Sequence, residues 1–149
     1  MIVVDTNIIA ARTLTSDLTS KARKVEKKDP VWIVPPLWRY EFQNILATAM
    51  KAQQITPGDA LHVWQSVSEL MLENESEASP ADVIDVVAQS RITAYDAQFV
   101  ALAMELGVFL ITEDRGLRSK FAGVAISMED FIRGPDIEEP ARSKKGDRR

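Results

Sequence analysis

Short apolar runs, bounded by polar or turn-forming residues, recur along the chain. Their length and their content of Val, Ile and Phe predict buried β-strands. Two of the runs lead into acids: the first ends at Asp5, and the third is followed by Thr112, Glu113 and Asp114. The predicted strands are residues 2–4, 31–34, 108–111 and 124–126.

The segments between these runs have the spacing of helices. Strands that alternate with helices in this way predict an α/β fold, a three-layer α/β/α sandwich with a mostly parallel central sheet. Thr6 or Asn7 is the expected cap of the first helix, and Thr56 begins a capping-box pattern with Asp59. The predicted helices are residues 8–14, 18–28, 37–54, 56–72, 81–89, 94–106, 115–121 and 128–132.

Two of these helices carry an acid close to their start. Glu41 lies in the first turn or two of the helix that follows a predicted strand, and Asp96 lies in the first turn of a helix that is apolar nearly all round. The helix that carries Asp96 is therefore expected to be buried. One side of the helix that carries Glu41 is made of Leu37, Tyr40, Asn44, Ala47 and Met50, and Glu41, Ile45 and Thr48 follow next to them.

The chain is expected to form one domain over residues 1–133. From residue 134 to residue 149 it contains almost nothing to bury, so this segment is predicted to be a disordered charged tail. A very short edge strand in 73–79 is possible from the pattern, but its signal is weak.

Composition narrows the chemistry. The 149 residues include no cysteine and one histidine, which excludes disulfides, thiolate nucleophiles and Cys- or multi-His metal sites. No apolar run reaches the length of a membrane span, and no signal peptide is apparent, so a cytoplasmic protein without a membrane partner is expected. The net charge of −4 argues mildly against nucleic-acid binding, although bound cations reverse the local sign.

Four acids are expected to meet at one edge of the sheet. Asp5 and Asp114 follow strands, while Glu41 and Asp96 start helices that open at the same edge. Carboxylates that lie this close together need either raised, coupled pKa values or a divalent cation. An all-oxygen ligand set favours Mg²⁺ or Mn²⁺, and these ions support phosphoryl chemistry.

Each feature also has a purely structural interpretation. Any one of these acids, taken alone, is better explained as a helix cap or a surface residue. Trp64 is best explained by core or dimer packing, and His62 by a structural or exposed position. The basic side of helix 18–28 is best explained as a solvated face, with a phosphate or partner surface as the alternative.

Several motifs follow one another along residues 1–133. They are Val3-Val4-Asp5-Thr6-Asn7, the helix-borne Glu41, Tyr95-Asp96-Ala97 with Val100-Ala101-Leu102-Ala103, and Ile111-Thr112-Glu113-Asp114 with Leu117. Their order and spacing resemble the PIN domain, and more narrowly the VapC-type toxins of bacteria and archaea. The resemblance implies a metal-dependent endoribonuclease acting on single-stranded or loop RNA, a homodimer and, in toxins, a cognate antitoxin protein.

Carried over by position, the resemblance makes Asp5, Glu41, Asp96 and Asp114 the acidic quartet and the metal ligands. Asp5 and Asp96 are expected to bind the ion directly, and the other two directly or through water. Thr6, Asn7 and Thr112 are supporting polar residues, while Glu113 is expected to alternate to the other face. Candidate phosphate contacts are Arg39, Arg91, Arg115 and Arg118.

The sequence thus predicts an endoribonuclease that uses Mg²⁺ or Mn²⁺ and metal-activated water, the toxin of a type II toxin–antitoxin pair. Three alternatives stay open. One is a housekeeping RNA-processing nuclease, and another is a non-catalytic, acid-lined binding module. The third, a phosphotransferase or phosphatase with Asp5 as nucleophile, is disfavoured because Asn7 stands where such chemistry needs a second acid.

Overall fold

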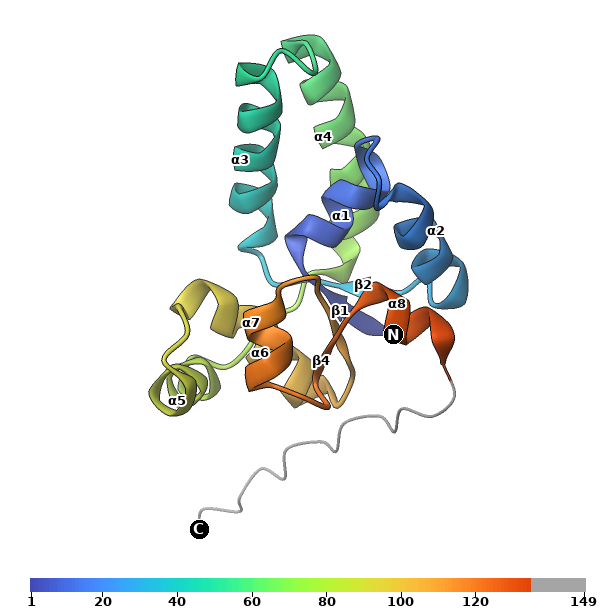
Figure 1. The fold of residues 1–149 in the computed structure, drawn as a ribbon. Helices are drawn as coiled ribbons and strands as arrows, with labels where there is room; N and C mark the ends of the chain where they lie inside the picture. Colours follow the sequence, from blue (N-terminus) through green and yellow to red (C-terminus); the bar gives the residue numbers. More distant parts are fainter. Residues whose placement is uncertain (135–149) are drawn as a thin grey trace.

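A computed structural model describes residues 1–134, and it has a four-stranded sheet in which every strand pairing is parallel (Figure 1). The order of strands across the sheet is β2-β1-β3-β4, so the first strand lies at the centre. This arrangement confirms the predicted α/β fold with a parallel sheet. The strands are β1 (Ile2–Val4), β2 (Trp32–Ile33), β3 (Leu110–Ile111) and β4 (Ala125–Ile126).

The helices fall close to the segments predicted for them. Within residues 1–134, no helix is long and apolar enough to cross a lipid bilayer. The α-helices are α1 (Thr6–Thr13), α2 (Thr19–Lys28), α3 (Trp38–Lys51), α4 (Pro57–Met71), α5 (Pro80–Ser90), α6 (Ala94–Leu106), α7 (Arg115–Lys120) and α8 (Met128–Arg133); a short 3-10 helix, η1 (Leu72–Asn74), follows α4.

The alternation of side chains along each strand divides the core into two layers. Ile2 and Val4 point to one face of the sheet, whereas Val3, between them, points to the other. In β3, Ile111 and Leu110 divide in the same way. Helices cover both faces, which is why these strands are apolar at every position rather than at alternate ones.

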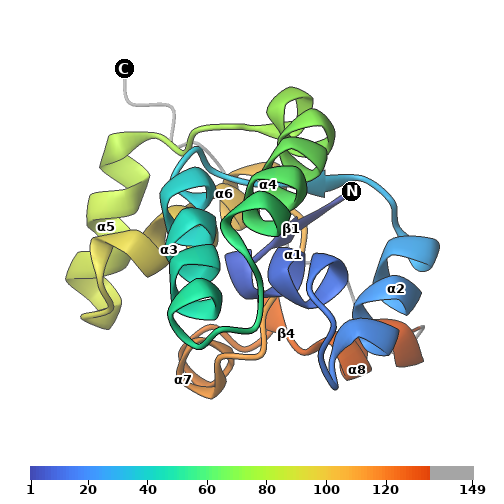
Figure 2. The ribbon, with the colours of Figure 1, turned by 90° about the horizontal axis from the view of Figure 1, so that it is seen from above.

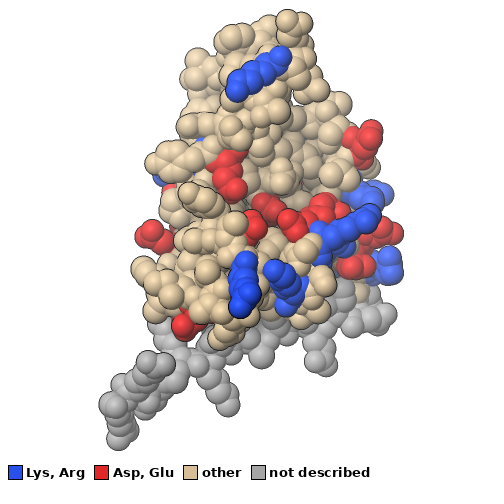
Figure 3. Space-filling model, turned by 60° about the vertical axis from the view of Figure 1, so that its left-hand side comes forward, with Lys and Arg blue, Asp and Glu red and all other residues tan. Residues whose placement is uncertain are grey.

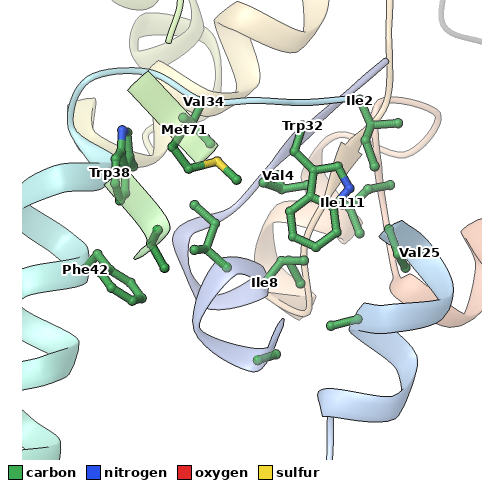
Figure 4. Packing of buried hydrophobic residues seen from close by; sticks show 14 of the residues in the cluster. Ile2, Val4, Ile8, Val25, Trp32, Val34, Trp38, Phe42, Met71 and Ile111 are labelled. Carbon is green, nitrogen blue, oxygen red and sulfur yellow. The ribbon is translucent and has the colours of Figure 1, made fainter. Parts of the chain in front are cut away.

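One layer contains α1, α2, α3, α4 and α8, and the other contains α5, α6 and α7 (Figures 1 and 2). The first layer packs on Ile2, Val4 and Ile111, with Val25 of α2 and Met71 of α4 also buried there (Figure 4). In the second layer α6 is buried on several sides, as its composition predicted, and five consecutive residues of it, 99–103, are buried.

An aromatic cluster joins α3 to α4, the two helices that stand up from the sheet in Figure 1. The ring of Trp38 stacks on that of Trp64 with centroids 5.4 Å apart, and Phe42 lies 6.1 Å from Trp38 and 6.3 Å from Trp64. Trp38 also donates a hydrogen bond from Nε1 to Glu75 Oε1, at 2.7 Å. These contacts confirm the packing role expected for Trp64.

The side of α3 that carries Tyr40 is not the side that faces the core. Tyr40, which shares a side with Leu37 and Met50 by its spacing, is 70% exposed. Two sets of residues at helical spacing compete along this segment, and the set with the larger aromatic surface faces the core, because it gains more from burial. The buried residues of α3 are Trp38, Phe42, Leu46 and Ala49.

The start of α1 also differs from the prediction. Thr6 is the first helical residue, so Asp5 occupies the N-cap position instead of Thr6 or Asn7, and its side chain makes no capping hydrogen bond. Strand β1 therefore passes into α1 with Asp5 alone between them. The capping box of Thr56 and Asp59 is present as predicted, with both hydrogen bonds at 3.1 Å.

The weak strand signal in 73–79 corresponds to a single parallel bridge between Val34 and Glu75. Gly107 ends α6 with a positive φ of 65°, a conformation that glycine adopts without strain. The predicted tail lies outside the described residues from position 135 onward.

Replacing Phe42 with alanine should lower the free energy of unfolding by about 3–5 kcal/mol, because the ring is fully buried. The matched control is Tyr40→Ala, an aromatic deletion on the exposed side of the same helix, which should change stability by about 0.5 kcal/mol or less. Urea denaturation followed by circular dichroism measures both. Equal losses would contradict the assignment of the buried face.

Candidate functional site

The carboxyl ends of β1 and β3 place two acids side by side. The strands are neighbours in the sheet, with Val4 registered against Ile111. Asp5 follows the first strand directly, and Asp114 follows the second by three residues. The backbone extends this pairing, because Asp5 N donates to Ile111 O at 3.0 Å.

Helices from opposite layers bring the other two acids to the same edge. Glu41 lies in the first turn of α3, and Asp96 lies in the first turn of α6. Each is close enough to influence its neighbours electrostatically: Asp5 and Asp96 both raise the pKa of Glu41, and Asp96 and Asp114 both raise the pKa of Asp5. Each of the four acids that the sequence pointed to thus lies within electrostatic reach of at least two of the others.

Thr112 connects the two strand-end acids. Its side chain is fully buried, and its hydroxyl donates to Asp5 Oδ2 at 2.9 Å. The Thr112 hydroxyl oxygen, Oγ1, in turn accepts a hydrogen bond from Asp114 N at 3.1 Å. One hydroxyl thus fixes the orientation of the Asp5 carboxylate and the position of the loop that carries Asp114, which fits the supporting role expected for Thr112.

A second buried threonine holds Glu41. The hydroxyl of Thr6, which is 2% exposed, donates to Glu41 Oε1 at 2.9 Å. Because Thr6 is the residue after Asp5, the junction of β1 and α1 supplies one acid and orients another. Asn7 is exposed and lines the adjoining cleft, so it lies where a supporting polar residue was expected.

Helix caps fix the remaining two acids. Thr93 Oγ1 accepts from Asp96 N at 3.1 Å at the start of α6. Asp114 is itself the N-cap of α7, and its Oδ1 accepts from Leu117 N at 2.9 Å. A side chain at position 116 would crowd this cap, because a Cβ on Gly116 would lie 3.1 Å from Asp114 Oδ1.

Burial and mutual repulsion disfavour ionisation of three of these acids. The pKa of Asp5 is raised chiefly by burial, against the lowering effect of the Thr112 hydroxyl. Burial likewise raises the pKa of Glu41 and the pKa of Asp96, and the neighbouring carboxylates add to both shifts. A cluster of this kind is costly to the fold at neutral pH unless a cation compensates it.

Two of the four acids border a cleft of about 720 Å³ between α1 and α3, whereas Glu41 and Asp96 are not among the residues that line it. Asp5 and Asp114 line it, together with Asn44 and Thr48 of α3. Figure 3 shows acidic side chains gathered across the middle of one face of the molecule, with basic side chains next to them. The cleft is therefore open to a large ligand and carries negative charge on its lining.

Glu113 lies against the same cleft, rather than on the opposite side of the sheet. Strand β3 ends at Ile111, so the alternation used to predict its direction does not extend to Glu113. Its Oε1 accepts from Met128 N at 2.9 Å, at the first residue of α8. This bond gives Glu113 a structural function at the start of that helix.

The candidate phosphate contacts occupy different settings. Arg91 ends α5 in the left-handed conformation and is exposed, as is Arg115, which follows Asp114 directly. Arg118 donates from Nη2 to Glu113 O at 3.4 Å, while its Nε is buried and has no partner within residues 1–134. Arg39 forms two hydrogen bonds with Glu75, at 2.6 and 2.7 Å, so a phosphate would have to compete for it.

A second hollow, of about 340 Å³, lies between α1, α4 and β2 and contains none of the four acids. It is lined mainly by apolar side chains, including those of Ile9, Trp32 and Met71. His62 borders it and is exposed, in agreement with a non-catalytic position.

The donor set fits a hard divalent cation. No three Asp, Glu or His side chains in the described part of the chain are already spaced to coordinate one ion together. Mg²⁺, however, keeps several of its waters and is commonly held by one or two carboxylates. Asp5 and Asp96, whose charges repel at present, meet that requirement, and the hydroxyls of Thr6 and Thr112 already orient two of the carboxylates.

The sequence reasoning missed two contributors to the site. Thr93 stands three residues before Asp96, the same Thr-x-x-Asp pattern that was recognised at Thr56, so this cap was readable. Gly116 gave no comparable signal, since the need for a small residue there arises only from the position of the Asp114 carboxylate.

Replacing Asp5 with asparagine should stabilise the metal-free protein at neutral pH, by about 1 kcal/mol. The folded protein binds the Asp5 proton more tightly than the unfolded chain does, so this group's contribution to stability falls as pH rises from its ordinary pKa of 3.8 through the raised one. Denaturation in EDTA at pH 3 and pH 7 measures the effect, which should be present only at the higher pH. A variant less stable than the wild type at pH 7 would contradict the assignment.

Comparison with known proteins agrees with this geometry. The family model described as "PIN domain" matches residues 2–122, which include all four acids. Among solved structures, the crystal structure of PAE2754 from Pyrobaculum aerophilum superposes with a TM-score of 0.69 at 25% sequence identity, over 88% of this chain and 92% of that one. The search of curated proteins finds no match. PIN domains are generally nucleases and generally use divalent metal ions, and this chain belongs to the PIN-domain family.

Proposed function

We propose that this protein is a metal-dependent endoribonuclease that cleaves single-stranded or loop RNA. The observation that carries the proposal is the group of four acids, held at one sheet edge by buried hydroxyls and helix caps, in a fold whose members are generally nucleases. Three of the four have raised pKa values. Because mutual repulsion of these acids destabilises the fold, a purely structural role does not explain their placement.

In the proposed mechanism, Asp5 and Asp96 hold Mg²⁺ or Mn²⁺, with Glu41 and Asp114 acting on it directly or through water. The bound ion would lower the pKa of water and stabilise the charge of the phosphoryl transition state. Glu41, which the Thr6 hydroxyl holds in place, would complete the site or orient the attacking water. The hydroxyl of Thr112 orients the Asp5 carboxylate by a hydrogen bond, and the hydroxyl of Thr6 orients the Glu41 carboxylate in the same way.

RNA would bind mainly through its phosphates and its unpaired bases. Arg91 and Arg115 are exposed, and Arg115 follows directly after one of the site acids. Arg118 has an unpartnered Nε among the described residues, and Arg39 would have to exchange Glu75 for a phosphate. These four arginines are the proposed phosphate contacts.

We further propose that the nuclease is the toxin of a type II toxin–antitoxin pair, active in the cytoplasm as a homodimer and neutralised by a cognate antitoxin protein. The support is the resemblance of its motifs to VapC-type toxins. A housekeeping RNA-processing enzyme with the same site is the alternative. A phospho-aspartate enzyme is disfavoured by Asn7, and a binding-only module by the presence of all four acids.

Asp5→Ala and Asp96→Ala should each abolish cleavage of single-stranded RNA in Mg²⁺, a loss of at least about 100-fold, because each removes a proposed metal ligand. Gel analysis of a labelled RNA measures the rate, and circular dichroism verifies that the variants are folded. Asp85→Asn, an exposed acid on α5, serves as the control and should cleave like the wild type. Undiminished cleavage by both site variants would remove the proposal.

Metal binding gives a readout that does not depend on cleavage. Saturating Mg²⁺ should raise the melting temperature of the wild type, by about 5 to 10 °C at a hundredfold excess over Kd. Neither site variant should show this rise. Cleavage by the wild type in EDTA would contradict a metal-dependent reaction.

Expression of the chain alone should arrest bacterial growth, and Asp5→Ala should relieve the arrest. Co-expression of the small gene immediately upstream, if it encodes an antitoxin, should restore growth of cells that carry the wild type. Normal growth with abundant, active wild-type enzyme would favour the RNA-processing alternative.

A further inference from the structure

The only two tyrosines of the chain stand immediately before two of the site acids. Tyr40 precedes Glu41 on α3, and Tyr95 precedes Asp96 on α6. These two residues are 70% and 66% exposed, although both lie in the first turns of helices that pack on the core. Within residues 1–134, neither ring belongs to a core cluster, so packing in the core does not account for their placement.

Both tyrosines belong to the helix turns that carry two of the site acids. Asp96 raises the pKa of Glu41, so the first turns of α3 and α6 come within electrostatic reach of each other. Figures 1 and 2 agree in showing the start of α3 close to the start of α6. Each tyrosine is one residue, about 100° of helical turn, away from its acid. The two tyrosines thus neighbour site acids on two separate helices.

Polar residues lie close to each tyrosine along the chain. Gln43 and Asn44 are the exposed residues one turn after Tyr40, while Arg91 and Gln98 lie within four residues of Tyr95. The centre of a protein–protein interface is normally apolar and poor in charge. Single exposed aromatic rings among polar and basic groups match the surfaces that bind unpaired nucleotides, where bases stack on rings and phosphates meet cations.

We propose that Tyr40 and Tyr95 are stacking platforms for unpaired RNA bases on either side of the scissile phosphate. They are positioning residues: they hold the strand across the acids and select single-stranded over paired RNA, because a base within a duplex cannot offer its face to a ring. The inference rests on the proposed function and extends it by naming the residues that distinguish unpaired from paired substrate.

The test measures binding and turnover separately. Fluorescence anisotropy in EDTA, with a labelled single-stranded RNA oligonucleotide, should show affinity reduced about tenfold by Tyr40→Ala or Tyr95→Ala and more by the double variant. An abasic oligonucleotide with the same phosphates should bind the wild type and the variants equally. Tyr40→Phe and Tyr95→Phe should restore binding, since stacking needs the ring and not the hydroxyl. In Mg²⁺ the alanine variants should show a raised KM with little change in kcat.

Leu61→Ala is the control, because Leu61 is an apolar residue of α4 that is 58% exposed. Light scattering on every variant tests the other explanation, that the tyrosines join two copies of the chain. Two results would contradict the stacking role without contradicting the proposed nuclease function. One is a change from dimer to monomer on alanine substitution, and the other is an equal loss of affinity for normal and abasic RNA. If the wild type neither binds nor cleaves single-stranded RNA, the proposed function fails as well.

Discussion

The hydrogen bond from Thr112 to Asp5 joins two strand ends that are 107 residues apart in sequence, and the candidate site depends on it. Parallel pairing of β1 with β3 brings these ends together, and the buried hydroxyl between them converts proximity into a defined orientation. The Thr112 hydroxyl oxygen also accepts a hydrogen bond from Asp114 N, so the same side chain positions the loop that leads into α7. The arrangement concentrates negative charge at the carboxyl edge of the sheet.

This concentration opposes stability. Burial and repulsion raise the pKa of Asp5, Glu41 and Asp96, so the folded chain carries at neutral pH an electrostatic cost that its apolar core must offset. Two core layers on either side of a short sheet supply that stability, and they leave the strand ends free for polar residues. A divalent cation would remove the cost, which makes metal binding and folding thermodynamically linked.

Much of this was readable in the sequence, because apolar runs that end in acids predict both the strands and the position of their carboxylates. Other features required three dimensions. The buried face of α3 could not be chosen between the Trp38 and Tyr40 sets by spacing alone, since both recur with a helical period. Hydrogen bonds such as that from Thr6 to Glu41 join distant segments and leave no local sequence pattern. The Thr93 cap, in contrast, follows a local Thr-x-x-Asp pattern that the sequence does contain.

Crystals grown with Mn²⁺ offer the most direct test of the central claim, that the four acids form a divalent-cation site. The account predicts an anomalous difference peak in contact with the carboxylates of Asp5 and Asp96, at about 2.1 Å from their oxygens. The peak should be absent from crystals of Asp5→Ala grown in the same way. A peak bound elsewhere, or an empty acid cluster at saturating Mn²⁺, would contradict the account.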